Sequence, residues 1–164
     1  MKSSALYLRS IIFGINDSLV STVGFLAGIS VAGVPRATIV LTGVIYALVE
    51  AFSMAMGDFL SEESAEEYLS HSKVNDRPSI ISAVLMFISC VFTSLIPLIP
   101  YILFSAQTAL IVSICLSLSS LFIVGVISAR FSRLPVLWRG VRMASLGGAA
   151  IVMGVAIGMY MPVM

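Results

Sequence analysis

Charged and polar residues divide the chain into long apolar segments. Only Asp17 interrupts the first and only Glu50 the second, which is followed by the polar stretch SEESAEEYLSHSKVNDR. A long uncharged run (78–129) comes next, divided by IPLIPY (96–101), whose prolines remove backbone donors and favour a turn. A basic stretch, expected as a loop, leads to the last uncharged run (143–164). Because a helix that crosses a bilayer needs about 20 apolar residues, the pattern predicts five spans.

We therefore expect an all-α integral membrane protein with a single transmembrane domain over residues 1–164. The expected spans are residues 10–35, 37–60 (continuing as an acidic cytoplasmic helix to about residue 72), 79–101, 105–129 and 143–163.

Composition excludes several other classes of protein. Apolar residues make up 59% of the chain, charged residues 10%, and the mean hydropathy is +1.10, which leaves too little polar surface for a water-soluble globule. The net charge of +1 gives no basic face for nucleic acid. Cys90 and Cys115 lie in apolar stretches without ligand spacing, and His71 is the only histidine, expected to cap or solvate a helix end. With no phosphate-binding loop either, we expect neither an enzyme nor a bound cofactor.

The basic residues predict the orientation. With a cytoplasmic N-terminus, eight of the nine lie in cytoplasmic segments: Lys2, Arg9, Lys73, Arg77, Arg130, Arg133, Arg139 and Arg142. The other side holds only Arg36. This asymmetry predicts an N-terminus inside and a C-terminus on the opposite side.

Two carboxylates within the predicted spans are the strongest functional signal. An ionisable group at mid-membrane costs at least about 2.5 kcal/mol, so such groups usually mark ion pathways or proton relays. Asp17 follows Arg9 by eight residues and Glu50 precedes Asp58 by eight, which puts each roughly 12 Å inside the cytoplasmic edge of antiparallel neighbouring helices. The two carboxylates can meet at one level, as a cation site requires.

The second span adds a soft ligand to this candidate site. Glu50, Met54 and Asp58 follow one another at intervals of four and share a helix face, whereas Met56 falls on roughly the opposite face. Carboxylate oxygen with thioether sulfur suits a transition metal such as Fe²⁺ better than Mg²⁺ or Ca²⁺. The stripe continues into a group of acidic residues that we consider for metal capture: Glu62, Glu63, Glu66 and Glu67.

Each feature also has a plainer interpretation. Met54 can be packing filler, Asp58 can be interfacial, and the acidic group can be a solvated helix face. Asp17 and Glu50 can be protonated structural carboxyls, although no Lys or Arg within the spans could pair with them.

Small residues recur at intervals of four in three spans. They are Gly24 and Gly28 in the first, Ser53, Gly57 and Ser61 in the second, and Ala150, Gly154 and Gly158 in the fifth. Such stripes let helices approach closely in lipid, either within one protomer or between copies in a homo-oligomer.

The two segments that carry these residues resemble a known family. The paired signature of the vacuolar iron transporter family is similar to IIFGINDSLVSTVGFLAGIS (11–30) and EAFSMAMGDFLS (50–61). The family pattern is also similar to IPLIPY, to LFIVG (121–125) and to the Gly/Ala-rich last span. The resemblance implies a homodimer of five-helix protomers that exports Fe²⁺, and often Mn²⁺, from the cytosol, in several members in exchange for protons.

Carried over by position, the resemblance implies metal-site roles for Asp17, Glu50, Met54 and Asp58. The chain departs from the family pattern in the pair Asp17-Ser18, where Asp-Gly is usual, and in Asp58, where glutamate is usual. It also lacks the Glu- and Met-rich cytoplasmic domain that plant-type members insert between spans two and three.

These observations together predict a homodimeric transporter that moves Fe²⁺ or Mn²⁺ out of the cytoplasm in exchange for protons. A non-transporting membrane scaffold or sensor, and a passive cation channel, remain as alternatives. The expected partners are divalent metal ions, protons, the lipid bilayer and a second copy, without nucleic acid. The compact form favours a prokaryotic plasma membrane over a vacuolar or other organelle membrane.

Overall fold

The computed structural model consists of five long helices. It describes residues 3–72, 75–132 and 136–161, so the basic residues Lys2, Lys73 and Arg133 lie outside the described part. The helices are α1 (Ser3–Val31), α2 (Arg36–Ser70), α3 (Arg77–Leu103), α4 (Ala106–Ser132) and α5 (Val136–Tyr160). Each is long and apolar enough to cross a membrane. The prediction of an all-α membrane protein with five spans is therefore confirmed.

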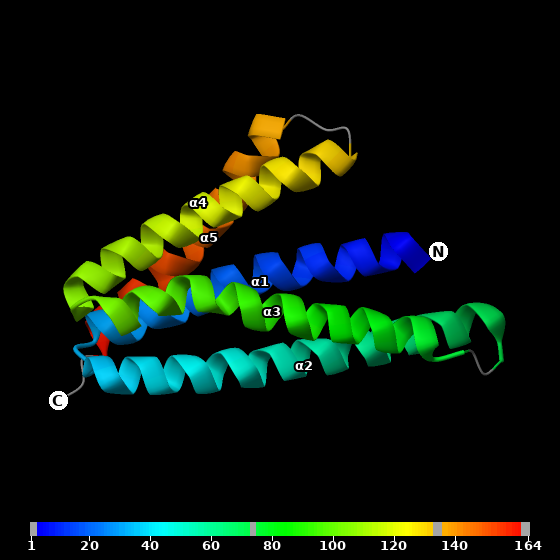
Figure 1. The fold of residues 1–164 in the computed structure, drawn as a ribbon, viewed down its shortest axis with the longest axis horizontal. Coiled ribbons are helices and arrows are strands. Elements are labelled where there is room, and N and C mark those ends of the chain that lie inside the picture. The colour runs from blue at the N-terminus through cyan, green and yellow to red at the C-terminus, as the bar shows by residue number, and fades with distance from the viewer. Residues whose placement is uncertain (1–2, 73–74, 133–135, 162–164) are drawn as a thin grey trace.

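The helices alternate in direction along the bundle (Figure 1). One end of the bundle holds the start of α1, the end of α2, the start of α3, the end of α4 and the start of α5. The α1–α2 and α3–α4 connections and the end of α5 lie toward the other. α1 is central, since it contacts each of the other four helices. α4 and α5 lie against each other and diverge from the other helices toward the end where α1 begins.

The second helix is longer than a span requires. Its 35 residues extend over about 52 Å at 1.5 Å per residue, against about 30 Å for the hydrocarbon core of a bilayer. The surplus lies at its acidic end, as the sequence predicts. α2 ends at His71, whose left-handed backbone (φ 49°) and N–H···O bond of 2.9 Å to the Glu67 carbonyl close the last turn. His71 thus caps a helix end, as expected.

Two expectations about the connections are wrong. Pro97 and Pro100 lie inside α3, which ends at Leu103, rather than in a turn. Membrane helices tolerate proline where neighbouring groups satisfy the backbone. Here the Ser113 hydroxyl on α4 donates to the Pro97 carbonyl at 2.7 Å and links α4 to the proline-containing turn of α3. The C-cap residue Phe104 donates its own N–H to the Pro100 carbonyl at 2.9 Å.

The basic residues of the expected loop lie largely in helices. Arg130 belongs to the last turn of α4, and Arg139 and Arg142 belong to α5, which begins at Val136. Arginine is a good helix former, so the change from apolar to basic residues marks an edge of the apolar span and not the end of the helix.

Glycines bring α1 and α5 into backbone contact. A Cβ atom at Gly154 would lie 2.0 Å from the Gly24 carbonyl oxygen, and one at Gly158 would lie 2.1 Å from the Gly28 oxygen. Neither position has room for a side chain. The small-residue stripes of the first and fifth spans therefore pack on each other within one protomer.

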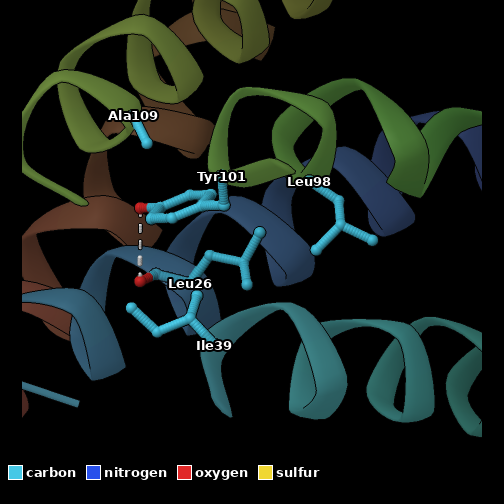
Figure 2. Packing of buried hydrophobic residues seen from close by; sticks show 5 residues of the cluster. All are labelled: Leu26, Ile39, Leu98, Tyr101 and Ala109. Atoms are coloured by element: carbon cyan, nitrogen blue, oxygen red, sulfur yellow. Dashed lines mark hydrogen bonds between the residues drawn. The ribbon is translucent and has the colours of Figure 1, made fainter. Parts of the chain in front are cut away.

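A buried cluster joins four helices at the end of the bundle opposite the acidic extension. Leu26 of α1, Ile39 of α2, Leu98 and Tyr101 of α3 and Ala109 of α4 are all at most 1% exposed (Figure 2). The Tyr101 hydroxyl, 3.5 Å from the Leu26 carbonyl, points at the backbone of α1. This cluster fixes the α1–α2 pair at one end, so that the two helices carry their carboxylates at a set spacing.

Candidate metal site

A groove between α1 and α2 brings together three of the four predicted site residues. Asp17 of α1 lines it with Glu50 and Met54 of α2, and its volume is about 560 Å³. No lysine or arginine lines this groove. The two carboxylates are close enough for electrostatic repulsion between them, and a bound cation would relieve that repulsion.

The two carboxylates differ in how they are held. The Tyr46 hydroxyl, one turn before Glu50, donates to Glu50 Oε1 at 3.1 Å. Phe25 of α1 stacks on the Tyr46 ring, with centroids 4.5 Å apart and planes 13° from parallel. The Asp17 carboxylate accepts no hydrogen bond from any residue that the structure describes, although its backbone carbonyl accepts one from the Ser21 hydroxyl at 2.8 Å. Glu50 is thus oriented and Asp17 is free to bind a ligand.

Asp58 lies outside this groove, in a polar cluster of three helices. It is 7% exposed. The Ser82 hydroxyl on α3 lies 2.7 Å from its Oδ2, and the Ser10 hydroxyl on α1 lies 3.0 and 3.1 Å from its two oxygens. The two serine oxygens are themselves 2.7 Å apart. These donors compensate a buried carboxylate, so in this conformation Asp58 already has its hydrogen-bond partners.

A second groove lies beside Asp58 and shares one lining residue with the first. It has a volume of about 330 Å³ and is lined by Arg9, Phe13, Met54, Gly57, Asp58, Ser61 and Met86. Met54 lines both grooves. Along α2, Met54 thus stands one turn from Glu50, which lines the first groove, and one turn from Asp58, which lines the second.

The acidic extension of α2 is partly neutralised. Glu62 is 8% exposed and forms an ion pair with Arg9. Glu63 and Glu66 are half-buried and Glu67 is exposed. Among the described residues, no three His, Cys, Asp or Glu side chains converge as a metal cluster would require. The expected capture group is thus a set of separate carboxylates in this protomer.

Sequence reasoning missed several residues of this region. Tyr46 could have been found, since it stands one helical turn from Glu50. Ser10 and Ser82 reach Asp58 across 48 and 24 residues of sequence, and Arg9 reaches Glu62 across 53. No local pattern reveals such pairings.

Comparisons with known proteins agree with this architecture. The model of the VIT family matches residues 8–80 and 66–159. An uncharacterised protein of the archaeon Methanocaldococcus jannaschii is 27% identical over 155 residues, covering 84% of this chain and 81% of the relative. The two family matches together extend over nearly the whole chain. The protein therefore belongs to the VIT family, the vacuolar iron transporters, whose members transport metal ions.

Proposed function

We propose that this protein carries Fe²⁺ or Mn²⁺ out of the cytoplasm in exchange for protons, through the groove between α1 and α2. The pairing of Asp17 with Glu50 in a groove without a basic residue carries the proposal. Two carboxylates at membrane depth are costly unless they bind a cation or a proton. The Met54 thioether beside them favours a transition metal over Mg²⁺ or Ca²⁺.

The two grooves suggest an order of events. A hydrated cation is attracted to the carboxylates at the acidic end of α2, among them the half-buried Glu66 and the exposed Glu67, and enters the groove beside Asp58. There it loses water and contacts Met54, which lines both grooves. It then binds between Asp17 and Glu50. Asp58 joins as a ligand when its serine donors turn away.

Protonation of the carboxylates releases the ion. A carboxylic acid carries no charge to hold a divalent cation, so two protons that arrive from the far side, one for Asp17 and one for Glu50, replace the metal. Tyr46, which donates to Glu50, keeps this side chain in the groove in either protonation state.

A second copy of the chain would complete the site. The Asp17–Glu50 groove lies on the outside of the protomer, next to a face of α2 whose large apolar residues are exposed: Leu41, Ile45, Leu48, Val49 and Phe52. Ser53, Gly57 and Ser61 are exposed on the same helix, and a Cβ at Gly57 would meet nothing within 4 Å. Carboxylates facing lipid would be strongly unfavourable. A homodimer that joins two α2 faces would shield them and bring two grooves together.

We further propose a cytoplasmic N-terminus and a prokaryotic plasma membrane. The acidic end of α2 and the arginines at the α4–α5 end lie toward the end of the bundle where α1 begins, which fits the positive-inside rule. The archaeal relative supports a prokaryotic origin.

The decisive experiment measures metal flux in liposomes that contain the purified protein. Fe²⁺ and Mn²⁺ uptake is recorded with and without a proton gradient, together with the movement of protons in the opposite direction. An exchanger takes up metal faster when the liposome interior is more acidic than the outside. Protons then leave the liposome as metal enters. An uptake rate that does not depend on the proton gradient identifies a passive channel. Uptake no faster than that of protein-free liposomes identifies a scaffold or sensor. Either result overturns the proposal.

A further inference from the structure

Sulfur atoms from two helices meet behind the groove that contains Asp58. Cys90 and Met86 stand one turn apart on α3, 1% and 2% exposed, and pack in one cluster with Met54 of α2. The Cys90 thiol lies 3.9 Å from the Met54 sulfur and 3.5 Å from the Gly14 carbonyl of α1. Two sulfurs are thus in contact, and a third sulfur-bearing side chain, Met86, packs in the same cluster.

The distance between two of these sulfurs is suited to a shared ion. A metal–sulfur bond is about 2.3 Å long, so two sulfurs that bind one ion at an angle of about 115° lie about 3.9 Å apart. The Cys90–Met54 distance of 3.9 Å matches this value. The helices therefore hold two of the ligands at a distance from which neither has to move far.

An ion can reach this cluster from the groove. Met54 and Met86 both line the groove that also contains Asp58 and Arg9, so their thioethers are the first sulfur ligands that an entering ion meets. Cys90 lies directly behind Met54. At Gly14, a Cβ would stand 3.0 Å from the Cys90 sulfur, so the absence of a side chain on α1 leaves room for the thiol.

The donors available there are soft. The oxygens of Asp58 are occupied by the Ser10 and Ser82 hydroxyls, and Glu62 is paired with Arg9. The sulfur donors beside the groove are two thioethers and one thiol. Thioether and thiolate sulfur select Cu(I) over the harder divalent cations, and a monovalent ion suits a site with only one ligand that can carry charge.

We propose that Met54, Met86 and Cys90 form a three-sulfur site for one soft monovalent cation, Cu(I), distinct from the Asp17–Glu50 site for divalent metal. The ion binds the two thioethers and the Cys90 thiolate, and the thiol proton passes to water in the groove. Because Met54 also belongs to the transport path proposed above, an ion held here obstructs the passage of Fe²⁺ or Mn²⁺. The site therefore makes the transporter sensitive to inhibition by copper.

The test titrates the purified protein with Cu(I) under anaerobic conditions against a chromophoric Cu(I) chelator. We expect one ion per protomer. Cys90→Ser is expected to weaken binding by about 100-fold, since losing even an outer partner of a metal ligand costs about 10- to 100-fold. Met86→Leu is expected to weaken it by about 10-fold. Cys115→Ser and Met56→Leu, which change an exposed cysteine and an exposed methionine, serve as matched controls and should bind as the unmodified chain does.

Unchanged binding in Cys90→Ser, or loss of binding in Cys115→Ser, overturns the proposal. Should Cys90→Ser fail to fold, the X-ray absorption spectrum of copper-loaded Cys115→Ser decides instead: three sulfur neighbours at about 2.3 Å support the site, and nitrogen or oxygen neighbours refute it. Asp17→Asn separates this inference from the transport proposal. It is expected to abolish metal flux and still to bind one Cu(I) per protomer, so either hypothesis can fail alone.

Discussion

Replacing Gly154 by alanine should destabilise the bundle strongly, because α1 and α5 touch through their backbones at this point. The new Cβ would lie 2.0 Å from the Gly24 carbonyl oxygen and 2.9 Å from its carbonyl carbon. A carbon and a carbonyl oxygen approach to about 3.3 Å at closest, so the helices must separate by more than 1 Å. The obstructing atoms are backbone and no side-chain rotation can relieve the clash.

The expected cost follows from this geometry. Overpacking typically destabilises a protein by about 1–3 kcal/mol, occasionally more, and the clash of two helix backbones puts Gly154→Ala at about 3 kcal/mol. For a chain of this size, that corresponds to a fall in Tm of roughly 6–12 °C. Gly148→Ala is the matched control on the same helix, since its Cβ would meet nothing within 4 Å. It should gain up to about 1 kcal/mol of helix propensity.

The assay compares the thermal unfolding of both variants in detergent micelles, followed by the fluorescence of Trp138, the single tryptophan, and by size-exclusion chromatography. Gly154→Ala should melt well below the unmodified chain and Gly148→Ala at or above it. If the two variants melt within about 2 °C of each other, α1 and α5 do not cross at these glycines, and the reasoning fails.

Two further changes test the polar cluster at the same end as the acidic extension. Ser82→Ala removes a donor from the buried Asp58 carboxylate and should lower the free energy of unfolding by about 1–3 kcal/mol. Ser119→Ala, at an exposed position, is the control and should change Tm little. Equal Tm values for the two variants would contradict the role of Ser82. Arg9→Gln leaves Glu62 without its cation. It should strengthen Mn²⁺ binding, measured by electron paramagnetic resonance. The loss of stability should be at most about 1 kcal/mol because Arg9 is exposed. Unchanged Mn²⁺ affinity would show that Glu62 is no metal ligand.

The number of helices could be predicted from the sequence, and their ends could not. Five apolar segments imply five spans because each crossing needs its own apolar length. The ends depend instead on residues that tolerate both helix and loop. Arg139 and Arg142 extend α5 beyond its apolar run. Pro97 and Pro100 remain inside α3, although proline is more often found where a helix ends.

The candidate site was predictable where it depends on one helix or on two consecutive helices. The meeting of Asp17 and Glu50 follows from counting residues inward from the same membrane edge on antiparallel neighbours. Met54 follows from the spacing along α2. Asp58 shares that spacing, yet Ser10 and Ser82 draw it into a separate cluster. Its partner on α3 cannot be inferred from spacing, because the rotation of α3 against α2 is set by the packing of the whole bundle.

The pairing of the small-residue stripes shows the same limit. Three stripes of equal spacing are visible in the sequence, and nothing local distinguishes them. In the structure the stripes of α1 and α5 pack together, and Gly57 of α2 meets no neighbour. The partner of a stripe is a property of helix order in space, which the sequence pattern does not contain.

The most direct test of the transport pathway is the initial rate of Mn²⁺ uptake into proteoliposomes for Met54→Ala beside Met56→Ala. Both changes remove one methionine from α2, but Met54 lines both grooves, whereas Met56 is 42% exposed and lines neither. We expect Met54→Ala to reduce the rate by about 10-fold or more, the usual effect of disturbing a metal site, and Met56→Ala to leave it unchanged. Equal rates for the two variants would contradict a metal path between α1 and α2.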